Sequence, residues 1–405
     1  MANIYRARWL IPADGPVVDD GAVVAEGGRI VRVGPWSRVR PHAGPGDAVE
    51  TFADGVLLPG FVNAHTHLSL SDLKGKFRPT KNFPSWLARL AARRIIRGQA
   101  KIRRAIEAGA RESREAGTAA GADLTPDGPF DDLLGRDGAR WTVYGELFGF
   151  GETGMNRLAG AVAAMEALAA SGAPVRVGLS PHTPYTVGAE VFAAARCEAD
   201  ARGWPLSTHL HETLDEIAFT ERGEGRLHAW LHGLGFLPRG WRPAGVRPIR
   251  MLAEAGFFRG PVLAAHGNYL TDEDIAILAA SGSSVAYCPR SHAFFRHEDH
   301  PWRRLLAAGV NVCLGTDSLA SSPSLSVLDE VRFLFARESG TDPRLLLDMA
   351  TRRGARALGI ENEVGDLLPG LTATLCVVGP VGATREPLAA VLSGEGTVQP
   401  AGGPG

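Results

Sequence analysis

The stretch that decides the fold is residues 56–70, Val-Leu-Leu-Pro-Gly-Phe-Val-Asn-Ala-His-Thr-His-Leu-Ser-Leu. Apolar residues follow a Pro59-Gly60 break and lead into His65-Thr66-His67. Side chains two residues apart on a strand point to the same side, so both imidazoles are expected at one strand end. Such a pair is compatible with half of a metal site and equally with polar surface, so any further ligands have to come from elsewhere in the chain.

Composition narrows the class of protein. The chain has 405 residues, of which 45% are hydrophobic, and a formal net charge of −1. This is enough apolar material for a sizeable core, and the charge gives no sign of a nucleic-acid partner. The N-terminus lacks the apolar run of a secretory signal, and no segment reaches the ~20 apolar residues of a membrane span. We therefore expect a cytoplasmic protein without a membrane partner.

The two ends of the chain have a different pattern from its middle. Short strand-like runs separated by Gly and Pro occupy residues 1–57, and similar runs occur at 374–379 and 388–392. The economical interpretation is one small discontinuous β-sandwich domain made of residues 1–57 and 360–395. Residues 396–405 are rich in Gly and Pro and are expected to be a disordered tail.

The middle, residues 58–359, alternates apolar β-type runs with helical stretches, which predicts an α/β fold, specifically a (β/α)8 TIM barrel. One helix is expected over 83–115, and its basic part, 89–104, is interpreted as a solvated barrel exterior rather than an anion-binding face. Eight strands are expected at 56–63, 117–123, 141–148, 175–180, 205–210, 261–266, 284–288 and 311–315.

Polar residues follow several of these strands at their carboxyl ends, where such barrels carry their chemistry. His209 lies at the end of the fifth strand and Glu212 just after it, His266 ends the sixth strand, and Asp317 follows the eighth. Together with the histidine pair they provide nitrogen and oxygen ligands for a metal and further groups for acid–base chemistry.

The chain resembles the amidohydrolase superfamily over nearly its whole length. The motifs that carry the resemblance are Leu58-Pro-Gly-Phe-Val-Asn-Ala-His-Thr-His, Pro181-His-Thr-Pro-Tyr-Thr, His209-Leu-His-Glu-Thr, Gly315-Thr-Asp-Ser and Gly365-Asp-Leu-Leu-Pro-Gly-Leu-Thr-Ala. The most similar branch contains S-adenosylhomocysteine and methylthioadenosine deaminases, aminofutalosine deaminases and triazine chlorohydrolases.

The resemblance implies a role for each matching residue. Metal ligands would be His65, His67, His209 and Asp317. Catalytic groups would be Glu212, His266 and again Asp317. Substrate would contact His182, and we also expect His292, Trp86 and Ser318 at the same barrel mouth. The cofactor would be one divalent ion, zinc with iron as the alternative.

The number of metal ions depends on a residue that this chain lacks. Binuclear superfamily members use a carbamylated lysine after the fourth strand, whereas no lysine occurs after Lys101. A mononuclear site is therefore expected. The alternative is that Glu146, on the third strand, bridges two ions.

The expected reaction is hydrolysis of a C–N bond, as in a cyclic amidine deaminase acting on a small molecule. In this reaction Glu212 would protonate the ring nitrogen beside the carbon that is attacked. The leading substrate class is a 6-aminopurine nucleoside, with 6-aminodeoxyfutalosine of the menaquinone pathway as the specific expectation. Another heteroaromatic ring hydrolase, for guanine, cytosine or a triazine, is the runner-up, and a non-catalytic barrel scaffold is the remote alternative.

Two departures from the pattern bear on the substrate and partners. Ser85 precedes Trp86 where relatives have an acidic residue that binds the ribose diol. Residues 213–260 form a long insertion, here called the lid, in which Trp230, Phe236 or Trp241 would cover the substrate. A homodimer is the open alternative to a single chain.

Overall fold

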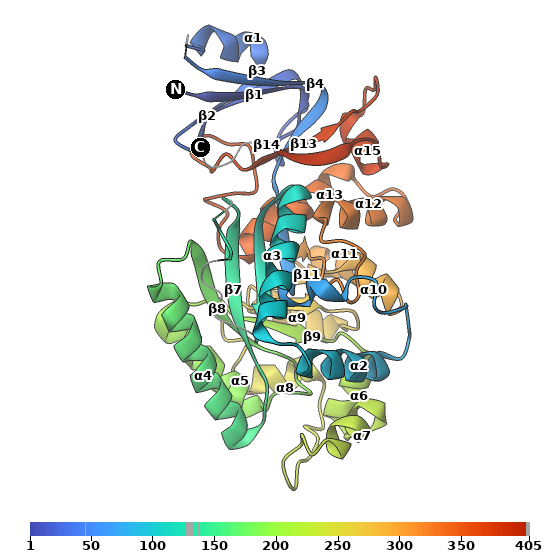
Figure 1. The fold of residues 1–405 in the computed structure, drawn as a ribbon. Coiled ribbons are helices and arrows are strands. Elements are labelled where there is room, and N and C mark those ends of the chain that lie inside the picture. The colour runs from blue at the N-terminus through green and yellow to red at the C-terminus, as the bar shows by residue number, and fades with distance from the viewer. Residues whose placement is uncertain (45, 127–132, 137, 402–405) are drawn as a thin grey trace.

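A computed structural model describes residues 1–44, 46–126, 133–136 and 138–401. It has a small β domain, formed by both ends of the chain, on one end of a barrel of parallel strands (Figure 1). The barrel consists of two four-stranded sheets, which meet at isolated bridges between Leu179 and Leu206 and between Thr66 and Asp317. The barrel strands are β5 Phe61–Thr66, β6 Thr118–Thr125, β7 Arg140–Leu147, β8 Val175–Pro181, β9 Ser207–Leu210, β10 Leu263–His266, β11 Ser284–Tyr287 and β12 Asn311–Leu314.

The predicted fold class is confirmed, and each of the eight expected strands is present. The start of the first strand was wrong, because Val56 to Pro59 belong to β4 of the β domain and β5 begins at Phe61. Gly60 separates the two strands where the chain passes close to its neighbours. A Cβ at this position would lie 2.5 Å from that of Ala119, so only glycine fits.

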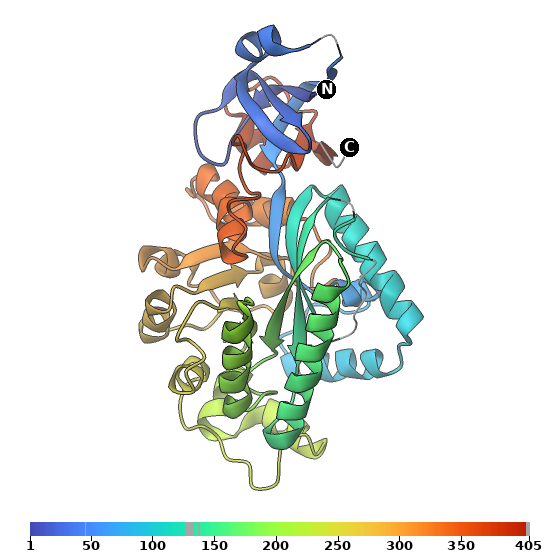
Figure 2. The ribbon, with the colours of Figure 1, turned by 90° about the vertical axis from the view of Figure 1, so that its left-hand side faces the viewer.

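The single helix expected over 83–115 is two helices, α2 Phe83–Ile95 and α3 Gln99–Glu115, with Gly98 at the start of the second. Figure 2 shows α4 and α5 packed along the outside of the barrel strands. The remaining helices are α4 Gly151–Ala170, α5 Ala189–Arg202, α6 Leu214–Arg222, α7 Gly225–Gly233, α8 Pro248–Glu254, α9 Asp272–Ala280, α10 Pro289–Phe294, α11 Trp302–Ala307, α12 Val327–Arg337, α13 Pro343–Ala350 and α14 Arg352–Ala357, with a 3-10 turn η2 at Leu68–Leu73.

The β domain is a six-stranded sheet in the order β14-β13-β4-β1-β2-β3. Two expectations for the C-terminal region were wrong. Residues 388–392 lie in helix α15, Pro387–Leu392, which begins with a proline at its first position. Thr397 to Ala401, expected in a disordered tail, form β14 and pair with β13, while 402–405 lie outside the described residues. The strands are β1 Asn3–Leu10, β2 Val18–Glu26, β3 Arg29–Pro35, β4 Ala48–Pro59, β13 Leu375–Gly379 and β14 Thr397–Ala401, and α1 Trp36–Val39 and η1 Arg40–His42 precede β4.

The inside of the barrel is filled by alanines together with larger side chains such as Tyr144 and Leu263. Ala64, Ala120, Ala122 and Ala286 are fully buried inside, in a cluster with Ile360 and other residues from the segment after α14. Helices α6 and α7 of the lid lie at the end of the molecule opposite the β domain (Figures 1 and 2). Within the described residues, no helix is both long enough and apolar enough to cross a membrane.

Candidate active site

Three histidine side chains and one aspartate converge at the carboxyl ends of the barrel strands. His65 is the fifth residue of β5, His67 follows that strand, and His209 lies in β9. The His65 ring centroid lies 5.0 Å from that of His67 and 4.8 Å from that of His209. Neither ring nitrogen of the fully buried His65 has a hydrogen-bond partner among the described residues. Unpartnered buried nitrogens are costly, so this arrangement points to a ligand between the rings.

The tautomers of two of these histidines follow from their backbone partners. His67 Nδ1 lies 3.0 Å from the carbonyl oxygen of Leu124, and His209 Nδ1 lies 3.1 Å from that of His182. A carbonyl only accepts, so each Nδ1 carries the proton and each Nε2 presents a lone pair. The two Nε2 atoms face each other at 3.1 Å. Two facing lone pairs repel each other unless a cation lies between them. A histidine that binds a metal commonly donates its other N–H to a carbonyl, as His67 and His209 do here.

Asp317 completes the group from the segment after β12. Its Oδ2 accepts hydrogen bonds of 2.7 Å from Ser291 and from Ser321. Its Oδ1 lies 3.9 Å from His65 Nε2 and 3.8 Å from His67 Nε2. One oxygen is thus fixed by two hydroxyls while the other faces the imidazoles. Three nitrogens and one carboxylate oxygen are a donor set that fits a zinc-like divalent ion.

Two further groups lie beside this cluster. Glu212 Oε1 lies 3.7 Å from His266 Nε2, and both residues are buried. Burial, with smaller contributions from the charges of Asp317 and Glu216, raises the pKa of Glu212 well above its usual range. Burial lowers the pKa of His266 to about 4. Burial thus favours the uncharged form of each side chain, a carboxylic acid for Glu212 and a neutral imidazole for His266.

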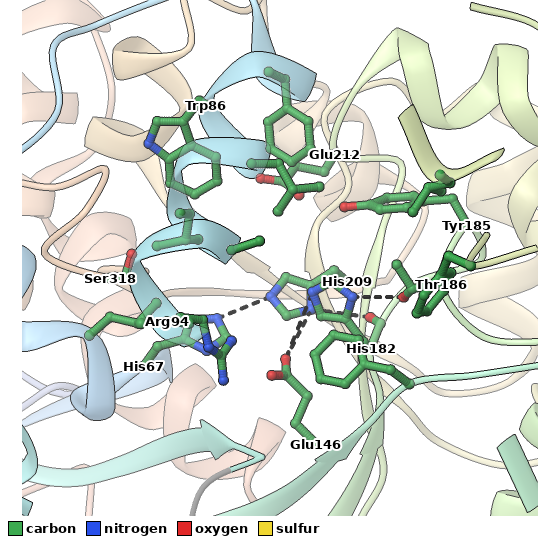
Figure 3. A pocket seen from close by; sticks show the side chains of 18 of the residues that line it. His67, Trp86, Arg94, Glu146, His182, Tyr185, Thr186, His209, Glu212 and Ser318 are labelled. Atoms are coloured by element: carbon green, nitrogen blue, oxygen red, sulfur yellow. Dashed lines mark hydrogen bonds and ion pairs between the residues drawn. The ribbon is translucent and has the colours of Figure 1, made fainter. Parts of the chain in front are cut away.

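All of these groups except His65 line one end of a cavity of about 460 Å³, here called its floor. Its walls are mainly apolar, and most of their residues come from α2, as Figure 3 shows for Trp86, and from the lid. His182, Tyr185, Thr186 and Ser318 also face it (Figure 3). The apolar lining residues include Leu70, Phe83, Leu87, Leu90, Phe148, Trp230, Leu231, Leu234 and Phe236.

The sequence pattern that defines the amidohydrolase family matches residues 56–399, a range that holds every group described above. The chain belongs to the amidohydrolase family. It is a hydrolase that acts on carbon–nitrogen bonds, and metal dependence is a property of this family.

Relatives of this amidohydrolase with similar sequences are deaminases. A 5-methylthioadenosine/S-adenosylhomocysteine deaminase of Moorella thermoacetica is 32% identical over 384 residues, which cover 91% of this chain and 83% of the relative. An aminodeoxyfutalosine deaminase of Deinococcus radiodurans is 32% identical over 363 residues, which cover 85% and 83%.

Solved structures have the same fold. The aminofutalosine deaminase of Helicobacter pylori in complex with methylthio-coformycin superposes with a TM-score of 0.86 at 23% identity, covering 98% of this chain and 97% of that one. An adenosine deaminase from Xanthomonas campestris with bound zinc gives a TM-score of 0.80 at 25% identity, covering 98% and 92%.

The amidohydrolase structure places most of the predicted site residues around this one cavity. His182, Trp86 and Ser318 line it, together with His67, His209, Glu212, His266 and Asp317. His292, which was expected over the mouth, is not among the described lining residues. It lies on α10, where its ring packs near those of Tyr287 and His300. The helix that carries it turns the side chain toward this aromatic group.

Glu146 is buried in β7, with its Oε1 4.0 Å from His182 Nε2 and from His209 Nδ1. With His67 and His209 it forms a second group whose possible ligand atoms lie within 4.8 Å of one another. A single ion and a Glu146-bridged pair therefore both remain predictions.

Some residues of the site were missed in the sequence. The basic stretch 89–104 was expected to face solvent, yet Arg94 lines the cavity with Leu87, Leu90 and Ala91. Their spacing of three and four residues marks one helix face, and that spacing was the available signal. Arg157, from α4, also lines the cavity. The hydroxyls that fix Asp317, from Ser291 and Ser321, gave no local signal of their role.

Proposed function

We propose that this amidohydrolase deaminates a 6-aminopurine nucleoside that carries an extended apolar arm, and that it uses one divalent metal ion. The observation that carries the proposal is the meeting, at one end of a largely apolar cavity, of an aspartate and three imidazoles with the buried Glu212, whose pKa burial raises. Deaminase relatives that are 32% identical over most of the chain support the reaction class.

The proposed ligands of the ion are Nε2 of His67 and His209, a ring nitrogen of His65 and Oδ1 of Asp317. Zinc is the expected ion, with iron as the alternative. When bound, such an ion supplies Lewis acidity and lowers the pKa of a water molecule in the site. The backbone carbonyls of Leu124 and His182 keep the ligating nitrogens of His67 and His209 unprotonated.

The side chains around the reacting ring would move the protons. Glu212, whose burial favours the protonated form, would donate to the ring nitrogen beside the carbon that carries the amino group. His266, neutral and 3.7 Å from Glu212, would orient the attacking water. Asp317 would accept a proton from that water and pass it to the departing nitrogen, which leaves as ammonia. Ser291 and Ser321 hold its other oxygen throughout.

The cavity walls favour a nucleoside over a bare base. The aromatic and aliphatic side chains of α2 and the lid lie beyond the polar floor, where an arm attached to the sugar would extend. Arg94 and Arg157 are cationic groups on this otherwise apolar wall, and they favour an acidic group at the end of the arm. We therefore propose 6-aminodeoxyfutalosine as the specific substrate, and His182, Trp86 and Ser318 as groups that contact it.

The test is ammonia release by the metal-loaded protein from a panel of substrates. The panel contains aminodeoxyfutalosine, S-adenosylhomocysteine, methylthioadenosine, adenosine, adenine, guanine, cytosine and melamine. We expect the highest kcat/KM on a nucleoside with an extended arm and little turnover of adenine. The same protein after chelation is the control. Equal activity on adenine and on its extended nucleosides, or turnover of guanine, cytosine or melamine alone, would contradict the proposal.

A further inference from the structure

We propose that Glu216 and Asn268 are positioning residues that hold the peptide groups around Glu212 and so aim its carboxyl group at the substrate ring. We call this pair of side chains the Glu212 clamp. The inference rests on the proposed role of Glu212 as proton donor. It goes further by assigning a function to two buried side chains outside the cavity lining.

Glu216 holds the backbone on the amino side of Glu212. Its Oε1 accepts a hydrogen bond of 2.9 Å from the amide of His211, and its Oε2 accepts one of 2.9 Å from the amide of Glu212. Its own amide donates to Thr213 Oγ1, the cap of α6, at 3.1 Å. Glu216 has no solvent exposure (0%), so water does not replace these bonds. The carboxylate thus ties the end of β9 to the first turn of α6.

Asn268 holds the same residue from the carbonyl side. Its Nδ2 donates a hydrogen bond of 2.9 Å to the carbonyl oxygen of Glu212, and Asn268 is also buried. It belongs to the segment after β10, so the two halves of the clamp come from different strand ends. Both the amide and the carbonyl of Glu212 are therefore fixed by side chains.

The residue before Glu212 shows why the backbone needs this support. His211 has a φ of +51°, in the left-handed region that a residue with a side chain adopts only at a cost. Its ring nitrogens lie 3.2 Å from Arg247 Nη2 and 3.3 Å from the amide of Ile249. Such a conformation persists only when surrounding contacts impose it. The clamp and the His211 contacts together turn the chain so that Glu212 faces the cavity.

Proton transfer depends strongly on the position of the donor, because displacement of a catalytic group by about 1 Å can cost on the order of a hundredfold in rate. Glu216→Gln and Asn268→Asp test the clamp with nearly isosteric changes. The first replaces one accepting oxygen with an N–H2 group, and the second replaces the donating N–H2 with an oxygen. The matched control is Asp366→Asn. Asp366 is a buried carboxylate that accepts from the amides of Ala13 and Leu367 at the β domain.

We expect each clamp variant to retain metal and KM while kcat falls by roughly tenfold or more. The inhibition constant of methylthio-coformycin, used as a transition-state analogue, should rise by a similar factor, while that of the deaminated product should hardly change. A partly unfolded preparation would lower the active fraction without changing either inhibition constant, so this readout separates positioning from folding. If both variants match Asp366→Asn in kcat and in inhibition constants, the clamp is overturned.

A second measurement keeps the clamp separate from the proposed function. Hydrogen exchange at the amides of His211 and Glu212 should be faster in Glu216→Gln than in the wild type and unchanged in Asp366→Asn. This result does not need turnover. Full activity of Glu212→Gln would overturn the proposed proton donor, while unchanged exchange at these amides in Glu216→Gln would overturn the clamp itself.

Discussion

Left-handed backbone conformations concentrate at the functional groups of this protein. Five residues other than glycine have a positive φ among the described residues, and three of them are His211, His266 and Asp317. Each lies at or just after the carboxyl end of a barrel strand. Conformations of this kind cost on the order of 1–3 kcal/mol and are retained where the surrounding structure imposes them. Strained backbone at the ends of β9, β10 and β12 therefore lowers the stability of the fold, and it sets the direction of the side chains at these positions.

The role of Glu212 can be separated from metal binding. Glu212→Gln keeps the shape of the side chain but cannot deliver a proton, so metal content should stay unchanged while kcat falls by roughly 10² or more. Elemental analysis and steady-state kinetics on the same preparation check this. Turnover close to that of the wild type would reduce Glu212 to a structural group.

A histidine away from the proposed metal ligands should give a measurable pH dependence of stability. His297 Nδ1 lies 2.9 Å from the Tyr269 hydroxyl oxygen, and burial, with the neighbouring His292 and His266, lowers the pKa of His297 to about 3. In the unfolded chain its pKa is about 6.5. Between these values the unfolded chain binds more protons, so the free energy of unfolding falls as the pH falls from about 6.5 toward 3.

His297→Gln keeps a hydrogen-bonding group near Tyr269 but cannot titrate. Denaturant unfolding at several pH values should show a shallower loss of stability below about pH 6.5 in this variant, by up to about 1.4 kcal/mol per pH unit. Parallel curves for the variant and the wild type would mean that His297 is protonated in the folded state.

At the scale of elements, the sequence predicted the strands better than the helices. Each barrel strand is a short apolar run bounded by turn residues, so its existence was visible locally. The break between α2 and α3 could not be seen in the sequence, because apolar residues recur every three to four positions in both helices. The strand at Thr397–Ala401 was hidden by its Gly- and Pro-rich surroundings, because it is stabilised by pairing with β13, a contact with a distant part of the chain.

The same reasoning explains which parts of the site could be predicted. His65, His67, His209, His266 and Asp317 carry recognisable chemistry at strand ends, so residue type and position sufficed to suggest them. Ser291 and Ser321 could not be predicted, because common residue types become informative only when the fold brings them to Asp317. Arg94 was expected to face solvent, because the apolar side of its helix was expected to pack against the barrel strands. In the structure the apolar side of α2 lines the cavity instead, and Arg94 lies on it.

The lid should determine selectivity for large substrates. Trp230 and Phe236 line the cavity, whereas Trp241 packs on Phe219 with ring centroids 4.6 Å apart. Trp230→Ala should therefore raise KM for an extended nucleoside more than for adenosine, because only the arm loses apolar contact. Trp241→Ala is the control for general weakening of the lid. An equal change in KM for both substrates in Trp230→Ala would show that the lid does not contact the arm.

At the scale of the whole molecule, the proposed metal site joins the two halves of the barrel. On one side, His65 lies in β5 and His67 directly after it. On the other side, His209 lies in β9 and Asp317 follows β12. Among the described residues, the strands of the two sheets pair with each other only through the isolated bridges Thr66–Asp317 and Leu179–Leu206. An ion bound by both halves should therefore strengthen the barrel itself.

Removing the ion should lower stability as well as activity. Elemental analysis should find about one transition metal per chain, and chelation should lower Tm by roughly 5 °C or more. His209→Ala should lose metal and activity together, and its Tm should not respond to the chelator. Two ions at full occupancy would show that the Glu146 group is filled as well.

The order of strands in the β domain has a consequence for synthesis on the ribosome. β4 pairs with β1 on one side and with β13 on the other, and β13 begins at Leu375, long after β4 ends at Pro59. At about 5–20 residues per second, translation of the intervening barrel takes on the order of tens of seconds. During this time the nascent chain carries an exposed strand edge, the kind of surface that invites association with other chains. Chaperones that bind extended apolar segments would find their target here, in the part of the enzyme farthest from its chemistry.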